Sequence, residues 1–186
     1  MKITLLGDSI RQIGYGTLVP TLLGQEYEVY QPKENCRFSK HTLRGLFDWH
    51  EDMRDCEIVH WNNGLWDTAT GRPDELPFST PEEYLANMLR IADYLLAHHR
   101  TVIFATTTPV RFGNRTQDND RIAAYNALVV PELQKKGVII NDLHATVSRD
   151  IDKYIREDDR IHLTEEGIRI CAEQVCACIR AAADKL

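Results

Sequence analysis

The sequence predicts an α/β fold in which helices cover both faces of a parallel sheet. Short apolar runs, several of them rich in β-branched residues, alternate with longer segments whose apolar residues recur at helical spacing. No repeat, low-complexity tract or obvious linker interrupts this alternation. Strands that alternate with helices favour a parallel sheet with right-handed crossovers. The 186 residues are the usual size of one domain, so we expect a single domain over residues 1–186.

Five apolar runs predict the strands of this sheet. Several of them end in turn-forming or polar residues, which is typical of buried strands. The predicted strands are residues 2–6, 26–30, 57–61, 101–106 and 138–140.

Five helical patterns complete the alternation. They cover residues 17–23, 43–54, 81–99, 118–135 and 164–184. The pattern at 81–99 is the clearest, because Thr80 can cap it, Pro81 fits its first turn and Glu83 completes a capping box. In the next pattern, Pro131 is expected to bend the helix.

Charge and hydrophobicity exclude several classes of partner. The formal net charge is -6 and no long Lys/Arg run occurs, which argues against binding nucleic acid or an anionic membrane surface. The apolar stretch that follows Met1 is too short for a signal-peptide core. No segment approaches the roughly 20 apolar residues that a membrane span needs. We therefore expect a cytoplasmic protein.

The cysteines predict neither disulfides nor a metal site. There are five, and an odd count without a secretion signal favours reduced thiols. Cys171, Cys176 and Cys178 lie in a helical pattern with no C-x-x-C pair or nearby histidine. We expect them to be small apolar core residues.

Reactive groups in a parallel α/β fold collect at the carboxyl ends of the strands. The first predicted strand ends at Gly7, Asp8 and Ser9. Gly7 permits a sharp turn, after which Ser9 can project from the edge of the sheet. Equally, Asp8 or Ser9 can simply cap the helix that follows.

Two further strand-end segments carry polar groups. Asn62, Asn63 and Gly64 follow the third strand, where they form either an oxyanion site or an Asn-Gly turn. Near the C-terminus, Asp159 stands three residues before His162. That spacing lets the carboxylate hold the imidazole in one tautomer, although a solvated acidic turn has the same spacing.

Taken together, these segments resemble the SGNH, or GDSL-like, hydrolase family over essentially the whole chain. Residues 7–10 (Gly-Asp-Ser-Ile) match its first sequence block with Ile for the usual Leu, and residues 159–162 match its last. The resemblance implies a flavodoxin-like three-layer α/β/α sandwich with a five-stranded parallel sheet. It also implies Ser9 as nucleophile, His162 as general base and Asp159 as the residue that orients the base.

The resemblance further implies an oxyanion hole with three donors. These are the Ser9 N–H, a backbone N–H of the second block and an asparagine side chain of the third. Asn62 is the preferred asparagine because it directly follows the strand, and Asn63 is the alternative. The second block, residues 35–39, lacks the usual glycine, so Ser39 or a neighbour is expected to donate.

Three more residues are candidates for substrate contact. Thr107 ends the fourth strand, where it faces the cleft or is merely a polar strand exit. Trp61 and Trp66 flank the asparagines and form a sugar-stacking or acyl-pocket wall, or fill the core. Arg11 contacts substrate or pairs with an acid.

The function expected from these residues is hydrolysis of a small-molecule carboxylic ester without metal or organic cofactor. An acetyl ester of a carbohydrate or other polar molecule is the first choice. A lipase-like or thioesterase-like activity on medium acyl chains is the alternative, which an apolar pocket lined by Phe38, Phe47 and Phe112 would favour. A non-catalytic binding protein of the same fold is the other alternative.

Overall fold

A five-stranded, all-parallel sheet forms the centre of the computed structural model, which describes residues 1–71 and 75–186. The strand order β2-β1-β3-β4-β5 is that of flavodoxin-like sandwiches. This confirms the predicted fold class. The strands are β1 (Lys2–Leu6), β2 (Glu28–Tyr30), β3 (Ile58–Trp61), β4 (Thr101–Ala105) and β5 (Ile139–Asn141).

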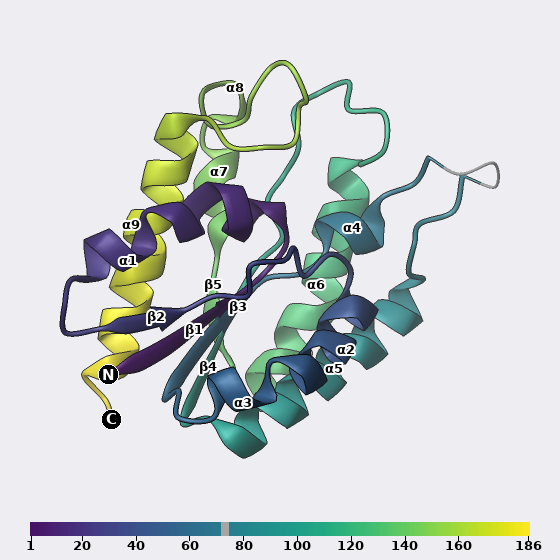
Figure 1. The fold of residues 1–186 in the computed structure, drawn as a ribbon. Coiled ribbons are helices and arrows are strands. Elements are labelled where there is room, and N and C mark those ends of the chain that lie inside the picture. The colour runs from purple at the N-terminus through teal and green to yellow at the C-terminus, as the bar shows by residue number, and fades with distance from the viewer. Residues whose placement is uncertain (72–74) are drawn as a thin grey trace.

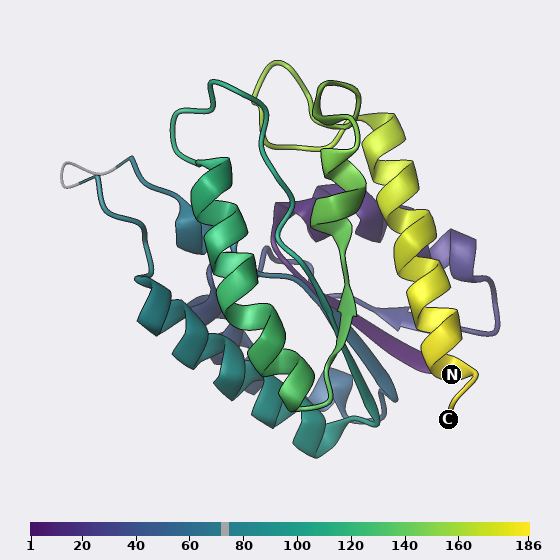
Figure 2. The same ribbon diagram turned by 180° about the vertical axis from the view of Figure 1, so that it is seen from behind.

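Helices cover both faces of this sheet, as the two ribbon views show (Figures 1 and 2). Because successive side chains of a strand alternate between faces, β1 contributes Ile3 and Leu5 to one core and Leu6 to the other. The first core is closed by α1 (Val19–Leu23), α7 (Leu143–Ser148) and α9 (Glu165–Ala183). The second is closed by α2 (Ser39–Asp48), α5 (Pro81–His98) and α6 (Asn119–Lys135).

The three longest helices, α5, α6 and α9, lie where the sequence predicts them. Thr80 and Glu83 form the expected capping box at the start of α5, and the Thr164 side chain caps α9. Pro131 lies inside α6, as the sequence places it. No helix in the described part of the chain is long and apolar enough to cross a membrane.

The predicted helix at 43–54 is wrong in its start and in its continuity. The chain instead forms α2 from Ser39 and then a separate α3 (His50–Met53). Several short helices were not predicted, because a segment of one or two turns is too short to show helical periodicity. These are η1 (Ile10–Gly14), η2 (Tyr15–Thr17), α4 (Leu65–Thr68) and α8 (Ile151–Tyr154), besides α7.

The strand register brings the polar segments of β1 and β3 together. Leu6 of β1 pairs with Trp61 of β3, so the residues that follow each strand leave the sheet side by side. Ser9 and Asn62 therefore belong to the same edge of the sheet. The loops before α6 and before α9 lie at this edge as well (Figure 1).

Candidate active site

Ser9 stands at the start of η1, directly after the turn that ends β1. Only glycine fits at position 7, since a Cβ there would lie 2.1 Å from Asn62 Oδ1 and 2.8 Å from Arg11 Cβ. The Asp8 side chain accepts the Ile10 N–H at 2.9 Å, whereas the Ser9 side chain makes no capping hydrogen bond. The capping role therefore falls to Asp8 and leaves the half-buried Ser9 hydroxyl available.

His162 and Asp159 form a compact unit in the loop before α9. Asp159 Oδ2 lies 2.9 Å from His162 Nδ1, while Oδ1 accepts the backbone N–H groups of Ile161 and His162, each at 2.9 Å. Partial burial raises the pKa of Asp159, but these hydrogen bonds outweigh it and lower the pKa to about 2. The carboxylate is therefore ionised at neutral pH and stabilises a protonated imidazole.

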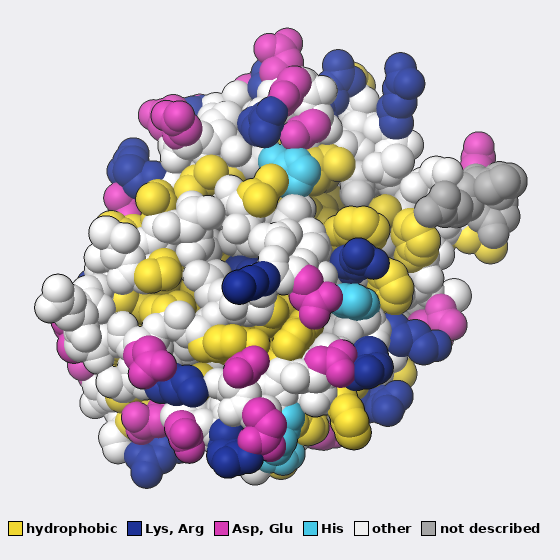
Figure 3. Space-filling view, in the orientation of Figure 1, with side chains coloured by type: hydrophobic (Ala, Val, Ile, Leu, Met, Phe, Trp, Pro, Cys, Tyr) yellow, Lys and Arg dark blue, Asp and Glu magenta, His cyan; other side chains and the backbone are white. Residues whose placement is uncertain are grey.

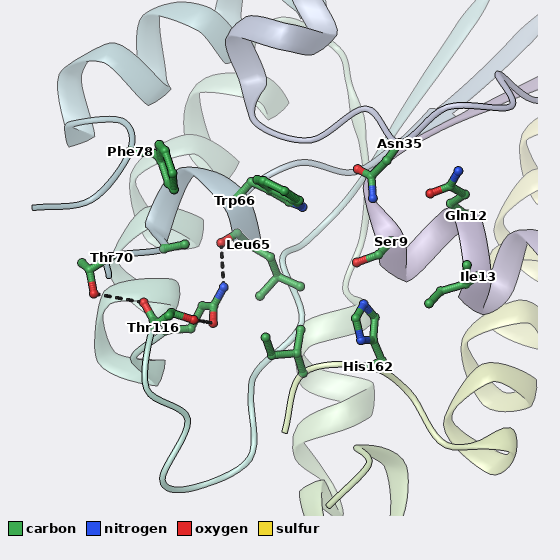
Figure 4. Close-up of a pocket in the computed structure, with 13 residues that line it drawn as sticks. Ser9, Gln12, Ile13, Asn35, Leu65, Trp66, Thr70, Phe78, Thr116 and His162 are labelled. Atoms are coloured by element: carbon green, nitrogen blue, oxygen red, sulfur yellow. Dashed lines mark hydrogen bonds between the residues drawn. The ribbon is translucent and has the colours of Figure 1, made fainter. Parts of the chain in front are cut away.

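Ser9 and His162 line one cavity of about 500 Å³. The ring of His162 points toward the Ser9 side chain, as the close-up shows (Figure 4). The hydrogen bonds among the described residues do not include one between these two side chains. The structure thus brings the three predicted catalytic residues to one place.

The Asn62 carboxamide lies under the Ser9 turn. Its Nδ2 donates to Asp8 Oδ1 at 2.9 Å, and its Oδ1 accepts from the Tyr15 hydroxyl at 2.7 Å. Asn62 is 5% exposed and is not among the residues that line the cavity with Ser9. One of the two Nδ2 hydrogens therefore points to Asp8.

Asn63 is fully buried beside the second sequence block. Its side-chain Nδ2 donates to the backbone carbonyl of Arg37 at 2.9 Å. Its backbone carbonyl accepts from the hydroxyls of Tyr84 and Thr107. Arg37 has a left-handed backbone, with φ 50°, in the segment where the resemblance leads one to expect glycine. The main chain thus keeps a conformation suited to glycine although an arginine occupies the position.

Ser39 is not available as an oxyanion donor, which corrects that prediction. Its N–H donates to both carboxylate oxygens of Asp67, at 3.1 and 2.9 Å, and its hydroxyl donates to the same carboxylate at 2.6 Å. Burial raises the pKa of Asp67, and the Ser39 and Ser79 hydroxyls counteract it. This cluster joins the start of α2 to α4 and explains why the helix begins at Ser39.

Trp61 and Thr107 are also corrected, because neither reaches the cavity. Trp61 is 0% exposed and packs on Phe104, with ring centroids 4.9 Å apart. Thr107 is buried, its N–H bound to Asn126 Oδ1 and its hydroxyl to the Asn63 carbonyl. Both therefore stabilise the sheet edge. Trp66, by contrast, is part of the cavity wall (Figure 4).

The apolar part of the cavity does not come from the predicted phenylalanines. Phe47 and Phe112 are 83% and 97% exposed, and Phe38 lines a different depression. Residues from segments distant in sequence form the wall instead, and of these only Asn35 and Ile161 belong to the sequence blocks. These wall residues are Gln12, Ile13, Asn35, Leu65, Ala69, Thr70, Phe78, Thr116, Gln117 and Ile161.

Arg11 is buried, does not line the cavity and forms no ion pair with an acid in the described part of the chain. Its guanidinium is 2% exposed and donates to the carbonyls of Gly7, Pro32 and Glu34, at 2.8–3.0 Å. These bonds tie the nucleophile turn to the segment that leads into the second block. Arg11 therefore holds two site segments in register.

Asp8 is fully buried beside the nucleophile. Burial raises its pKa to about 6, against the opposing effects of the Asn62 amide, the Ile10 N–H and the Arg11 charge. Its Oδ2 has no hydrogen-bond partner among the described residues. Nothing in the local sequence distinguishes this carboxyl from an exposed capping residue. Its burial follows from the packing of β1 against β3.

No protein-family model matches this sequence, and no curated protein is similar to it in sequence. Solved structures do match. A lipase/acylhydrolase from Enterococcus faecalis superposes with a TM-score of 0.80 at 17% identity, over 97% of this chain and 96% of that one. The chain has the fold of that acylhydrolase.

Two other solved structures also superpose on this chain over most of its length. An acetyl xylan esterase matches with a TM-score of 0.78 at 17% identity, over 96% of this chain and all of its own. A GDSL-like lipase from Bacteroides thetaiotaomicron matches with a TM-score of 0.73 at 16% identity, over 97% of this chain and 88% of its own. These likenesses confirm the fold that the sequence blocks implied.

Proposed function

We propose that the protein is a carboxylic-ester hydrolase in which Ser9 is the nucleophile, His162 the general base and Asp159 the residue that orients it. One observation carries the proposal: Ser9 and His162 line the same cavity, and Asp159 binds the opposite ring nitrogen at 2.9 Å. A serine, an imidazole and an orienting carboxylate in that order are the parts of an acyl-transfer site.

The mechanism follows from these parts. Ser9 Oγ attacks the carbonyl carbon of the ester while His162 Nε2 takes its proton. The tetrahedral intermediate then collapses, the bond to the alcohol oxygen breaks, and His162 returns the proton to that oxygen. Water, activated by the same imidazole, hydrolyses the acyl-enzyme and regenerates Ser9. Every step uses groups of this chain and needs no metal ion or organic cofactor.

For the oxyanion hole we propose the Ser9 N–H together with the Asn62 amide. Hydrogen bonds hold both ends of the Asn62 carboxamide, and its Nδ2 carries a second hydrogen besides the one given to Asp8. A donor fixed before the reaction stabilises developing charge without reorganisation. Asn63, bound to the Arg37 carbonyl beside the second block, is the alternative donor.

A small acyl ester on a carbohydrate or other polar molecule is the substrate that we propose first. Amide and hydroxyl groups of Gln12, Asn35, Thr70, Thr116 and Gln117 surround the cavity and can bind hydroxyls. Two of the similar structures are acetyl xylan and acetylxylan esterases, which supports an acetyl substrate.

A medium acyl chain is the second candidate, favoured by the size and the apolar part of the cavity. Besides the polar groups, Ile13, Leu65, Trp66, Phe78 and Ile161 line its volume of about 500 Å³. A series of p-nitrophenyl esters of increasing chain length separates the candidates. Hydrolysis confined to the acetate supports the first, and a maximum kcat/KM at longer chains supports the second.

Covalent labelling with a fluorophosphonate probe tests the enzyme itself. We expect stoichiometric labelling of the wild-type protein, because the probe reacts with an activated serine. Ser9→Ala should abolish the label, whereas Ser148→Ala, at an exposed serine of α7 outside the cavity, should retain it. No label on the folded wild-type protein contradicts the proposal and favours a binding protein of the same fold.

A further inference from the structure

A second cavity, of about 390 Å³, adjoins the first. Two loops form it, residues 113–116 and residues 158–161, and it shares Thr116 and Ile161 with the cavity of Ser9. The loops lie side by side beyond the carboxyl edge of the sheet in both ribbon views (Figures 1 and 2). Asp159 lines this second cavity and not the first, so the orienting carboxylate separates the two.

Specific contacts join the two loops. The Arg111 N–H donates to the Arg160 carbonyl at 2.9 Å, and Arg160 Nη1 donates to the Gly113 carbonyl at 2.7 Å. Gly113 has φ 78°, and a Cβ there would lie 2.5 Å from Arg160 Nη1. Arg160 itself has φ 61°. The guanidinium is thus held against the wall of the cavity.

The charges around this cavity are unequally paired. Arg156 binds Asp158 with two nitrogens and approaches Asp159 at 3.7 Å, and Asp159 also binds the His162 ring. Both carboxylates, Asp158 and Asp159, therefore have partners of their own. Basic and acidic side chains stand close together along the upper rim of this face, beside hydrophobic ones (Figure 3).

The two arginines that line the cavity, Arg115 and Arg160, have no carboxylate partner among the described residues. Arg160 binds a neutral carbonyl, and Arg115 forms no hydrogen bond or ion pair with the described part of the chain. Two arginines and two aspartates line the cavity, and Arg156 and His162 already engage the aspartates. Arg115 and Arg160 are therefore the charged groups of the lining that have no carboxylate partner among the described residues.

We infer that the second cavity binds an anionic group, a carboxylate or a phosphate monoester, on the alcohol portion of the substrate. The inference rests on the proposed function. His162 must reach the leaving oxygen to protonate it, so the alcohol lies on the imidazole side of the site. The second cavity opens on that side, beyond Asp159 and Ile161, and guanidinium groups match the geometry of carboxylate and phosphate oxygens.

A matched pair of substrates tests the inference. 4-Acetoxybenzoate and 4-acetoxybenzamide carry the same acyl group and alcohols of nearly equal size that differ in charge, and 4-acetoxyphenyl phosphate supplies the phosphate arm. The measured quantity is the preference, the ratio of kcat/KM for each anionic ester to that for the amide. We expect Arg115→Gln and Arg160→Gln each to lower this preference about fivefold. The control Arg169→Gln, at an exposed arginine of α9 paired with Glu173, should leave it within about twofold.

Binding to the Ser9→Ala protein gives a readout that does not depend on turnover. In an NMR titration, 4-acetoxybenzoate should bind more tightly than the amide, and Arg115→Gln in the same background should remove the difference. A preference that survives both arginine substitutions, or equal affinities in the titration, overturns the inference. Absence of any hydrolysis by wild-type protein counts against the proposed function instead, and the titration still decides the anion site. A loss confined to one anionic ester identifies which anion the cavity accepts.

Discussion

The hydroxyl of Tyr15 donates to Asn62 Oδ1 at 2.7 Å and thereby fixes which end of the carboxamide faces Asp8. Both residues are buried, so water cannot replace this bond. Tyr15 is for this reason a positioning residue for the proposed oxyanion donor.

Tyr15→Phe should lower kcat about tenfold and leave KM nearly unchanged. The substitution keeps the ring in the core but leaves the buried Asn62 oxygen without a partner, at a cost of about 1–3 kcal/mol in the free energy of unfolding. Steady-state kinetics and urea denaturation measure the two effects. Tyr27→Phe, a half-buried tyrosine packed on the same core, is the control. A Tyr15→Phe enzyme with unaltered kcat shows that Asn62 needs no such support.

Asn62→Ala should lower kcat by roughly 10²–10³-fold, the loss typical of one oxyanion donor. Because the transition state alone carries the charge, KM should change little. Asn63→Ala serves as the matched comparison at the adjacent position. If Asn63→Ala produces the large loss and Asn62→Ala the small one, Asn63 is the donor and our assignment of the third block is displaced by one residue.

Asp159→Asn should lower kcat by up to about 10⁴-fold while circular dichroism shows an intact fold. The carboxylate accepts two backbone N–H groups and the His162 ring, and an amide cannot stabilise the imidazolium in the same way. Asp158→Asn, which removes the neighbouring surface carboxylate paired with Arg156, is the control and should cost far less. Full activity of Asp159→Asn contradicts the triad.

Asp8→Asn should remove a loss of stability that the wild-type protein undergoes as pH rises. The pKa of Asp8 is raised in the folded protein to about 6 from 3.8, so the folded state holds a proton that the unfolded state releases between about pH 4 and 6. Wild-type stability therefore loses about 2–3 kcal/mol from this group as pH rises through that window, and the loss persists above it.

The free energy of unfolding of Asp8→Asn minus that of the wild type should accordingly increase from pH 4 to pH 6 and then level off. Asp159 acts oppositely: its pKa of about 2 contributes stability above about pH 4 that is lost as pH falls toward 2. Urea denaturation of the wild type, Asp8→Asn and Asp159→Asn across pH 2–8 measures both. Asp184→Asn, at the exposed end of α9, is the control. A difference that is constant with pH shows that folding does not raise the pKa of Asp8.

Local signals in the sequence determined the sheet, the long helices and the position of the three proposed catalytic residues. Continuous apolar runs located β1 and β3 nearly to the residue, and the Thr80–Glu83 capping box located the start of α5. The short spacing between Asp159 and His162 was sufficient to predict their contact, because the loop itself brings them together.

Tertiary packing decided the surroundings of those residues. The sequence left both Trp61 and Trp66 open as cavity wall or core, and the packed structure places Trp61 in the core and Trp66 on the cavity wall. Likewise, the local sequence around Ser39 does not reveal that its N–H donates to Asp67, which is 28 residues away. Composition and periodicity report which side chains are apolar and on which face they repeat. Which buried polar groups meet depends on strand order and register, because the partners are distant in sequence and come together only when the sheet has formed.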